Sequence, residues 1–243
     1  VLNGLKGDLL LDADGKVLTF VPVVSSTTGA AVSNAAVILS ADKSTSGISA
    51  LTGGRTDFAV YRNGVLSSVS ALRRNDVVTY DASSNTLYAC DTRVAVYYEA
   101  CDPSPSAPSS ITVLNGTQFT VLPTAQESLS KFKPGKTMTL LLTSDGSVAG
   151  AVDSENSARA NAVGVVDSNG KLQMFCGSSI IEIAGTYSEY SGKLVGISAS
   201  KDKTVSLSAK SGGASGNLDV REGTLGSRKL ADNALIYVDG ELK

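Results

Sequence analysis

Short apolar runs separated by tight-turn dipeptides recur along the chain and predict β-hairpins. In "LLLDADGKVLTF", residues 9–20, apolar residues lead into Asp14-Gly15 and out again. "VGVVDSNGKLQMF", residues 163–175, repeats this arrangement around Asn169-Gly170. Asp-Gly and Asn-Gly favour the left-handed backbone of two-residue hairpin turns, so each stretch predicts two antiparallel strands.

Two further stretches extend the hairpin pattern. "LLLTSDGSVAGAV", residues 140–152, turns at Asp145-Gly146. "VVTYDASSNTLYA", residues 77–89, is a looser version with a longer turn. Alternation of apolar and polar residues on both sides of these turns is typical of strands with one buried face.

Similar phrases occur in the same order in both halves of the chain, which predicts an internal repeat. The corresponding pairs are residues 12–20 and 167–175, 38–44 and 197–204, and 57–64 and 233–240. "ITVLNG", residues 111–116, is a weaker further copy of the phrase at residues 57–64.

The repeat divides the chain into a first β unit at residues 1–152 and a second, apparently truncated β unit at residues 153–243. The first unit includes "DPSPSAPSS", residues 102–110, which we expect to be an extended Pro/Ser spacer. The strands missing from the second unit either follow in a longer tandem array or come from the N-terminal segment. The first residue is Val1 rather than Met, which indicates a mature exported piece or a segment of a longer chain.

Two stretches predict short helical turns. Residues 124–132 begin with Thr124 and carry Glu127 three residues later, which is the spacing of a capping box. Residues 68–76 predict a second turn of this kind. Both are too short to cover a sheet, so a βαβ architecture is excluded. The predicted fold class is all-β with minor short helical turns, in small antiparallel β-barrel or sandwich units in an internally repeated arrangement.

Composition agrees with this pattern and excludes several partners. The 243 residues are 42% hydrophobic and 18% charged, with neither Trp nor His. A net charge of −2 and the isolated Arg73-Arg74 pair give no basic patch, so we expect no nucleic-acid partner. No run of about 18 apolar residues exists, so we expect no membrane span in this segment.

The three cysteines, Cys90, Cys101 and Cys176, are an odd count that argues against a disulfide framework. The stretch between Cys90 and Cys101 alternates as one continuous strand. Such a strand would hold the two Cα atoms about 35 Å apart, whereas a disulfide needs about 5.5 Å. We expect buried free thiols.

No motif predicts a catalytic, cofactor or metal site. "DADG" resembles the start of a calcium loop, but Lys16, Val17 and Val23 occupy the positions where that loop needs a ligand, Gly and Glu. Without His, zinc sites and catalytic triads lack a principal ligand or base. The Ser-x-x-Lys at Ser40 lies between strand-like stretches rather than at the start of a long helix.

Exposed tyrosines are the weak candidates for a ligand-binding site. Tyr97 and Tyr98 occupy opposite faces of one strand, so one of them faces solvent. Tyr187 and Tyr190 flank a loop in "GTYSEYSGK". Tyrosine can stack on a sugar ring, although it also packs routinely at the edges of β cores. The candidates are Tyr97, Tyr187 and Tyr190.

A family resemblance lies in two stretches, residues 71–121, which begin with "ALRRNDVVTYD", and residues 129–152, which end with "SDGSVAGAV". They resemble the repeated β region of cell-surface proteins with S-layer homology modules, from Gram-positive gut anaerobes. This resemblance implies export and a surface role without established catalysis. The wall-binding modules of those proteins are helical and are not visible here, so anchoring is assigned to no residue.

The resulting expectation is a non-catalytic structural or spacer segment of an extracellular, cell-wall or S-layer-associated protein. The alternatives are an adhesin or carbohydrate-binding module of the cell envelope and, third, a glycoside or peptidoglycan hydrolase accessory domain. Candidate partners are a cell-wall polymer, a glycan or neighbouring modules. The residues expected to matter act in folding as turn formers: Gly15, Gly64, Gly116, Gly146, Gly170 and Gly240.

Overall fold

A computed structural model describes residues 7–11, 17–22, 35–153, 159–210, 215–230, 236–238 and 241–242. It is 41% strand and 10% helix, in several small and mostly antiparallel sheets, which confirms the all-β prediction at this level. Within the described residues no sheet closes into a barrel. None of the helices there combines the length and apolar character needed to cross a bilayer.

The chain divides into two units, residues 1–32 and 33–243. The described residues of the first unit form a hairpin, in which β1 (Gly7–Leu11) pairs antiparallel with β2 (Val17–Pro22). The register shifts between Leu10 and Leu11. The predicted strand pairing is confirmed, whereas the predicted Asp14-Gly15 turn lies outside the described residues.

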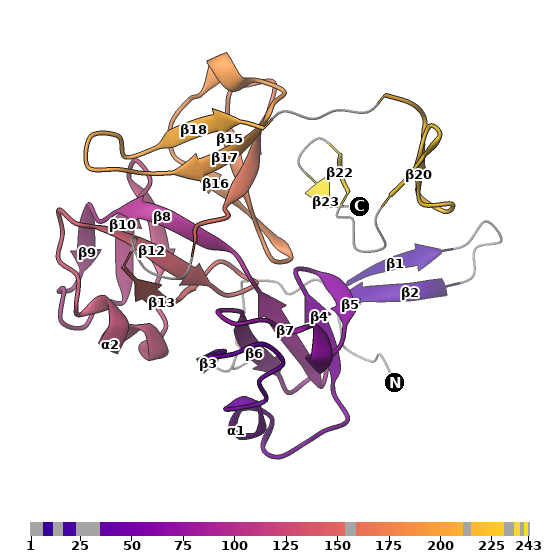
Figure 1. The fold of residues 1–243 in the computed structure, drawn as a ribbon, viewed down its shortest axis with the longest axis horizontal. Coiled ribbons are helices and arrows are strands. Elements are labelled where there is room, and N and C mark those ends of the chain that lie inside the picture. The colour runs from indigo at the N-terminus through magenta and orange to yellow at the C-terminus, as the bar shows by residue number, and fades with distance from the viewer. Residues whose placement is uncertain are drawn as a thin grey trace. The chain divides into compact units, whose positions relative to one another are not determined.

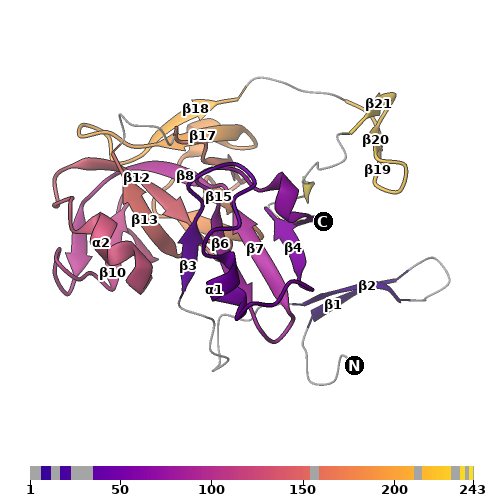
Figure 2. The ribbon, with the colours of Figure 1, turned by 60° about the horizontal axis from the view of Figure 1, so that its bottom comes forward.

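The second unit begins with a five-stranded sheet in the order β3-β6-β7-β4-β5 (Figure 1). β6 and β7 form the predicted hairpin, and β4 and β7 are the one parallel pair of this sheet. A short helix, α1, packs on β3 and β6 (Figure 2). The bounds are β3 (Ala36–Ile38), α1 (Ile48–Thr52), β4 (Ala59–Arg62), β5 (Val65–Ser67), β6 (Val77–Asp81) and β7 (Thr86–Cys90).

Two three-stranded sheets follow, in the orders β13-β12-β8 and β11-β10-β9. β12 and β13 are the predicted hairpin around Asp145-Gly146, and Gly146 has the left-handed φ of +86°. The bounds are β8 (Arg93–Tyr97), β9 (Ala100–Asp102), β10 (Ser110–Val113), β11 (Thr117–Thr120), β12 (Thr137–Leu142) and β13 (Val148–Val152).

A second five-stranded sheet has the order β16-β15-β14-β17-β18 and contains the predicted hairpin around Asn169-Gly170. Its bounds are β14 (Val163–Val166), β15 (Leu172–Cys176), β16 (Ser179–Ile183), β17 (Leu194–Ser198) and β18 (Ser206–Ala209), with the 3-10 turn η3 (Ser188–Tyr190). Short antiparallel strands complete the unit: β19 (Leu218–Asp219), β20 (Thr224–Leu225), β21 (Arg228–Lys229), β22 (Tyr237–Val238) and β23 (Glu241–Leu242).

One hydrophobic core joins the strands on both sides of residue 152. Val96 of β8 and Leu140 of β12 belong to it together with Met174 of β15 and Val195 of β17, and all four side chains are fully buried. The predicted boundary between residues 152 and 153 therefore runs through a shared core. The internal repeat, which concerns similar sequence phrases, stays a prediction.

Small residues in β13 bring the first five-stranded sheet against β12 and β13. A Cβ atom added at Gly150 would lie 2.6 Å from Cδ1 of Ile38, so the missing side chain makes room for the end of β3. Ala149, Ala36 and Leu141 are buried in the same contact. The run "VAGAV" is therefore a packing surface as well as a strand.

The stretch between Cys90 and Cys101 is not one continuous strand, so that prediction is wrong. β8 ends at Tyr97, and the chain then changes partner: the Tyr98 amide donates to the Lys136 carbonyl, and the Glu99 amide donates to the Thr112 carbonyl. The backbone thus leaves β12 and joins β10. The alternation within β8 is confirmed, because Val94 and Val96 are buried and their neighbours are only half-buried.

The capping box is also absent. The helical stretch starts one residue earlier than predicted, as the 3-10 turn η2 (Pro123–Ala125), and α2 (Gln126–Leu129) follows it with no side-chain cap. Proline at the first position, rather than Thr124, sets this start. The turn predicted within residues 68–76 is confirmed as η1 (Val69–Ala71).

Residues 102–110 do not form an extended spacer. The Ser109 amide donates to the Asp102 carbonyl at 2.8 Å, and β9 and β10 pair directly on either side of this loop. The prolines therefore shape a closed hairpin loop rather than a linker.

Gly170 is predicted to tolerate no side chain. Its φ is +79°, and an added Cβ would lie 2.7 Å from Oγ of Ser188. Gly170→Ala should lower the free energy of unfolding by about 1–2 kcal/mol because the backbone is left-handed there. Crowding of the added Cβ should lower it by about 1 kcal/mol more. Gly192 has a φ of +72° with open space around it, so Gly192→Ala is the matched control and should show only the first loss. Urea denaturation measures both; equal losses would contradict the packing of this turn.

Candidate functional site

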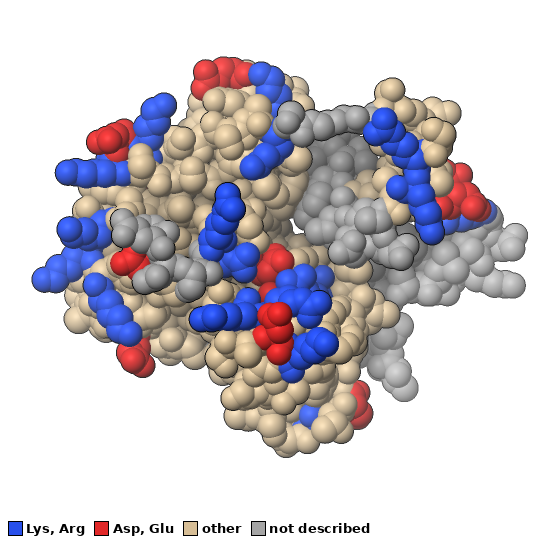
Figure 3. All heavy atoms as spheres, viewed as in Figure 1, with Lys and Arg blue, Asp and Glu red and all other residues tan. Residues whose placement is uncertain are grey.

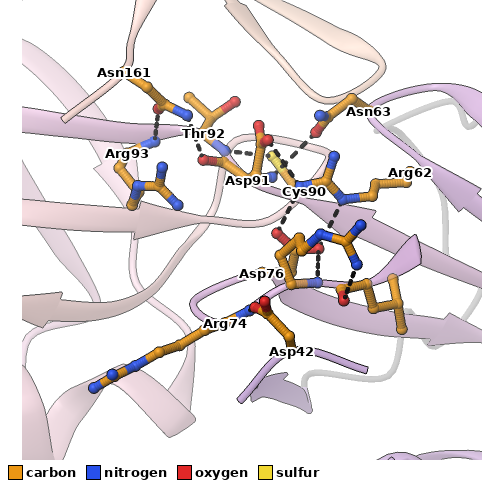
Figure 4. Close-up of polar contacts among 12 residues, drawn as sticks. Asp42, Arg62, Asn63, Arg74, Asp76, Cys90, Asp91, Thr92, Arg93 and Asn161 are labelled. Carbon is orange, nitrogen blue, oxygen red and sulfur yellow. Dashed lines mark hydrogen bonds and ion pairs between the residues drawn. The ribbon is translucent and has the colours of Figure 1, made fainter. Parts of the chain in front are cut away.

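A cluster of ion pairs and hydrogen bonds lies where the first five-stranded sheet meets β8 and the segment before β14. We call it the Arg62 junction, and it consists of Arg62, Asn63, Asp76, Asp91 and Asn161 (Figure 4). Arg62 ends β4, Asp76 precedes β6, and Asp91 follows β7. Three neighbouring strands of one sheet thus place charged side chains at their ends.

Arg62 holds a completely buried carboxylate. Its Nε donates to Asp76 Oδ2 at 2.8 Å and its Nη2 donates to Oδ1 at 3.0 Å, a bidentate pair. The Asp76 side chain is 0% exposed and that of Arg62 is 22% exposed. The backbone amide of Arg73 also donates to Asp76 Oδ2, at 2.9 Å. Burial of this charge is tolerable because three donors surround it.

Arg62 binds a second carboxylate at the same time. Its Nη2 lies 2.9 Å from Oδ2 of Asp91, whose side chain is 28% exposed. The hydrogen bond with Asp76, and then the charges of both carboxylates, raise the pKa of Arg62 above its ordinary value despite partial burial. The guanidinium is therefore a permanent cation with both of its anionic partners in place.

Two asparagines connect this ion cluster to other segments. The Asp91 amide donates to Asn63 Oδ1 at 3.1 Å, and Asn161 Nδ2 donates to the Asp91 carbonyl at 2.9 Å. The Arg93 amide donates to Asn161 Oδ1 at 2.7 Å. The junction thereby joins β4 and β7 to the start of β8 and to the segment before β14.

Local backbone geometry explains why these residue types stand here. Asn63 and Asn75 have φ values of +51° and +69°, in the left-handed region that Asn adopts more readily than most residues. Gly64, with a φ of +78°, completes the tight turn after β4. The turn sequences "RNG" and "RRND" therefore set the strand ends at which the ion pairs form.

A cavity of about 310 Å³ lies beside the junction. Its lining includes Asn63, Asp91 and Asn161 of the junction. It also includes the apolar residues Val163, Phe175 and Leu194. A second cavity, of about 180 Å³, lies along β17 and β18 and includes Lys210.

The junction is suited to holding sheets together. Its one cation faces two carboxylates, which leaves no excess positive charge to attract a substrate anion. Within the described residues, no group of three or more His, Cys, Asp or Glu side chains is placed to hold a metal ion. What the geometry offers chemically is charge neutralisation and hydrogen bonding inside the fold.

The three candidate tyrosines do not form one site. Tyr187 and Tyr190 stand at η3, whereas Tyr97 ends β8, and all three are half-buried. The hydroxyl of Tyr187 donates to the Ala184 carbonyl at 2.7 Å, and that of Tyr190 donates to the Leu207 carbonyl at 3.2 Å. Both rings pack against the main core. Tyr98 is fully buried, which confirms that the adjacent tyrosines occupy opposite faces.

Arg62, Asp76, Asp91 and Asn161 are not among the site residues predicted from the sequence. The first three carry a usable sequence signal, because each is a charged residue directly beside a turn at a strand end. Pairing them requires knowing that β4 lies next to β7, which no local pattern contains. On the face drawn in Figure 3, Lys and Arg are interspersed with Asp and Glu and form no continuous basic band.

Comparisons with known proteins give no family: no family model, no curated protein and no solved structure matches this chain.

Removing the Arg62 cation should destabilise the second unit strongly. Arg62→Met keeps much of the side-chain length but leaves Asp76 buried without its bidentate partner, which should lower the free energy of unfolding by about 3 kcal/mol. The control is Arg55→Met. Both side chains of the Arg55–Asp57 ion pair are exposed, so Arg55→Met should lower the free energy of unfolding much less. Chemical denaturation compares the two; similar losses would show that the junction is not a stabilising element.

Proposed function

We propose that this chain is a non-catalytic structural or spacer segment of a bacterial cell-surface protein, extracellular and associated with the cell wall or S-layer. Its small β units would follow the internally repeated, sandwich-like plan indicated by the sequence phrases. The observation that carries the proposal is the path of the chain through β7, β8 and β9, which belong to three different sheets.

This path couples the three sheets mechanically. β7 ends at Cys90 and β8 begins at Arg93, and β8 ends at Tyr97 and β9 begins at Ala100. Each connection has only two residues, too few to extend when the chain is pulled. Load on one strand therefore reaches the backbone ladders of the next sheet, where several hydrogen bonds resist together.

The Arg62 junction supports the same role. It lies at the first of these two connections and binds Asp91 through its side chain, its amide and its carbonyl. Polar groups that are committed to internal partners add rigidity to this connection rather than an external binding surface. An adhesin or carbohydrate-binding module remains the alternative, supported by the half-buried candidate tyrosines.

Pulling the chain between terminal handles tests the mechanical role. We expect a distinct unfolding event of the 35–210 region at forces well above those that stretch an unfolded chain. Arg62→Met should lower this force, whereas Arg55→Met should leave it unchanged, because only Arg62 clamps the β7–β8 connection. Extension without a force peak would contradict the proposal.

A binding assay separates the proposal from its alternative. Against purified Gram-positive cell walls and a glycan array, we expect no saturable retention that depends on Tyr97 or Tyr190. Saturable binding that is lost in Tyr97→Ala or Tyr190→Ala would favour the adhesin. The control is Tyr61→Ala, because Tyr61 stacks on Tyr88 in the first sheet and is not a candidate.

A further inference from the structure

Two of the three thiols meet in the core, although they are far apart in the sequence. Sγ of Cys90 lies 3.9 Å from Sγ of Cys176, and the two residues are 86 positions apart. Both side chains are fully buried in the main core. Each cysteine is the last residue of its strand, β7 or β15, so each sulfur is positioned by a regular ladder and followed by a turn.

Local contacts hold both sulfurs in place. The Cys176 thiol donates to the Thr143 carbonyl at 3.2 Å, and the Thr92 amide donates to Cys90 Sγ at 3.5 Å. Gly177 has a φ of +55°, and a Cβ there would lie 2.6 Å from the Ser144 Cα, so the turn after Cys176 sits directly against that backbone. The pair is thus a defined arrangement of the fold.

We propose that Cys90 and Cys176 form a disulfide when the protein meets a low-molecular-weight disulfide, and that this bond ties the two five-stranded sheets together covalently. The inference rests on the geometry of the pair and does not require the proposed structural role. A bond length of about 2.05 Å requires the sulfurs to approach by roughly 2 Å, within reach of side-chain rotation and small shifts at the two turns.

The reaction is two successive thiol–disulfide exchanges. The Cys90 thiolate attacks one sulfur of the oxidant RSSR, forms a mixed disulfide and releases RS⁻. The Cys176 thiolate then attacks the Cys90 sulfur, forms the protein disulfide and releases the second RS⁻. The two cysteine protons end on the two released thiolates, so the protein loses two electrons and the oxidant gains them.

The surroundings of the two thiols determine which one attacks the oxidant first. Contact with the Cys176 thiol lowers the pKa of Cys90, and the Thr92 amide also stabilises its thiolate. The same contact, together with burial, raises the pKa of Cys176 well above its ordinary value. Cys90 is therefore the first nucleophile and Cys176 the resolving thiol.

The cavity beside the Arg62 junction provides the approach. It is lined by Asp91 and Thr92, which follow Cys90, and by Phe175 and Gly177, which flank Cys176. A small local opening at either turn would connect this cavity to the sulfurs. Cys101, on β9, is half-buried and lies outside this arrangement, so it should remain free.

The test treats the folded, reduced full chain with oxidised glutathione, blocks the remaining thiols after denaturation, and maps the peptides by mass spectrometry. We expect a Cys90–Cys176 linked peptide, a loss of about 2 Da and one blockable thiol. The melting temperature of the oxidised protein should rise by at least about 5 °C, because the bond closes a long loop. Peptide mapping of the unaltered chain needs no variant that could fail to fold.

Variants then assign the bond. Cys101→Ser should oxidise as the parent does, whereas Cys176→Ser should give no internal crosslink and keep the reduced melting temperature after treatment. Linked peptides that contain Cys101, stable single glutathione adducts, or three blockable thiols after prolonged treatment of the folded chain would each overturn the proposal.

Discussion

A carboxylate with no exposure to water can remain in this fold only because a guanidinium faces it with two parallel hydrogen bonds. Asp76 and Arg62 meet this condition at the ends of β6 and β4. The pair fixes the ends of β4 and β6, and Nη2 of Arg62, which already contacts Asp76, also reaches Asp91 after β7. Two residues further on the chain enters β8, so the ion cluster lies at the connection to the next sheet.

The same region combines three kinds of constraint that act over different distances. The ion pairs join strand ends within one sheet, the asparagine side chains join that sheet to its neighbours, and the main core joins everything from β8 to β17. The thiol pair stands beside the ion cluster because Cys90 directly precedes Asp91. Charge, hydrogen bonding and apolar packing therefore converge on the few residues between β7 and β8.

Much of the secondary structure could be predicted, because hairpins depend on neighbouring residues. The turns at Gly146 and Gly170 and the alternation of β8 are local features, and the structure has them as expected. The junction could not be predicted, since Arg62 reaches partners 14 and 29 residues away. The thiols are separated still further. The strand predicted to continue past Tyr98 ends there because the backbone changes its hydrogen-bonding partner. No side-chain pattern marks such a change.

The parallel contact between β4 and β7 has a consequence for how the protein is made. β7 lies between β6 and β4, so the sheet is incomplete until the last of these strands has been synthesised. Until then the edge of β4 that later pairs with β7 has unpaired amides and carbonyls, open to strands of other chains. Synthesis from the N-terminus thus has a vulnerable interval that ends when residues 86–90 leave the ribosome and close the gap.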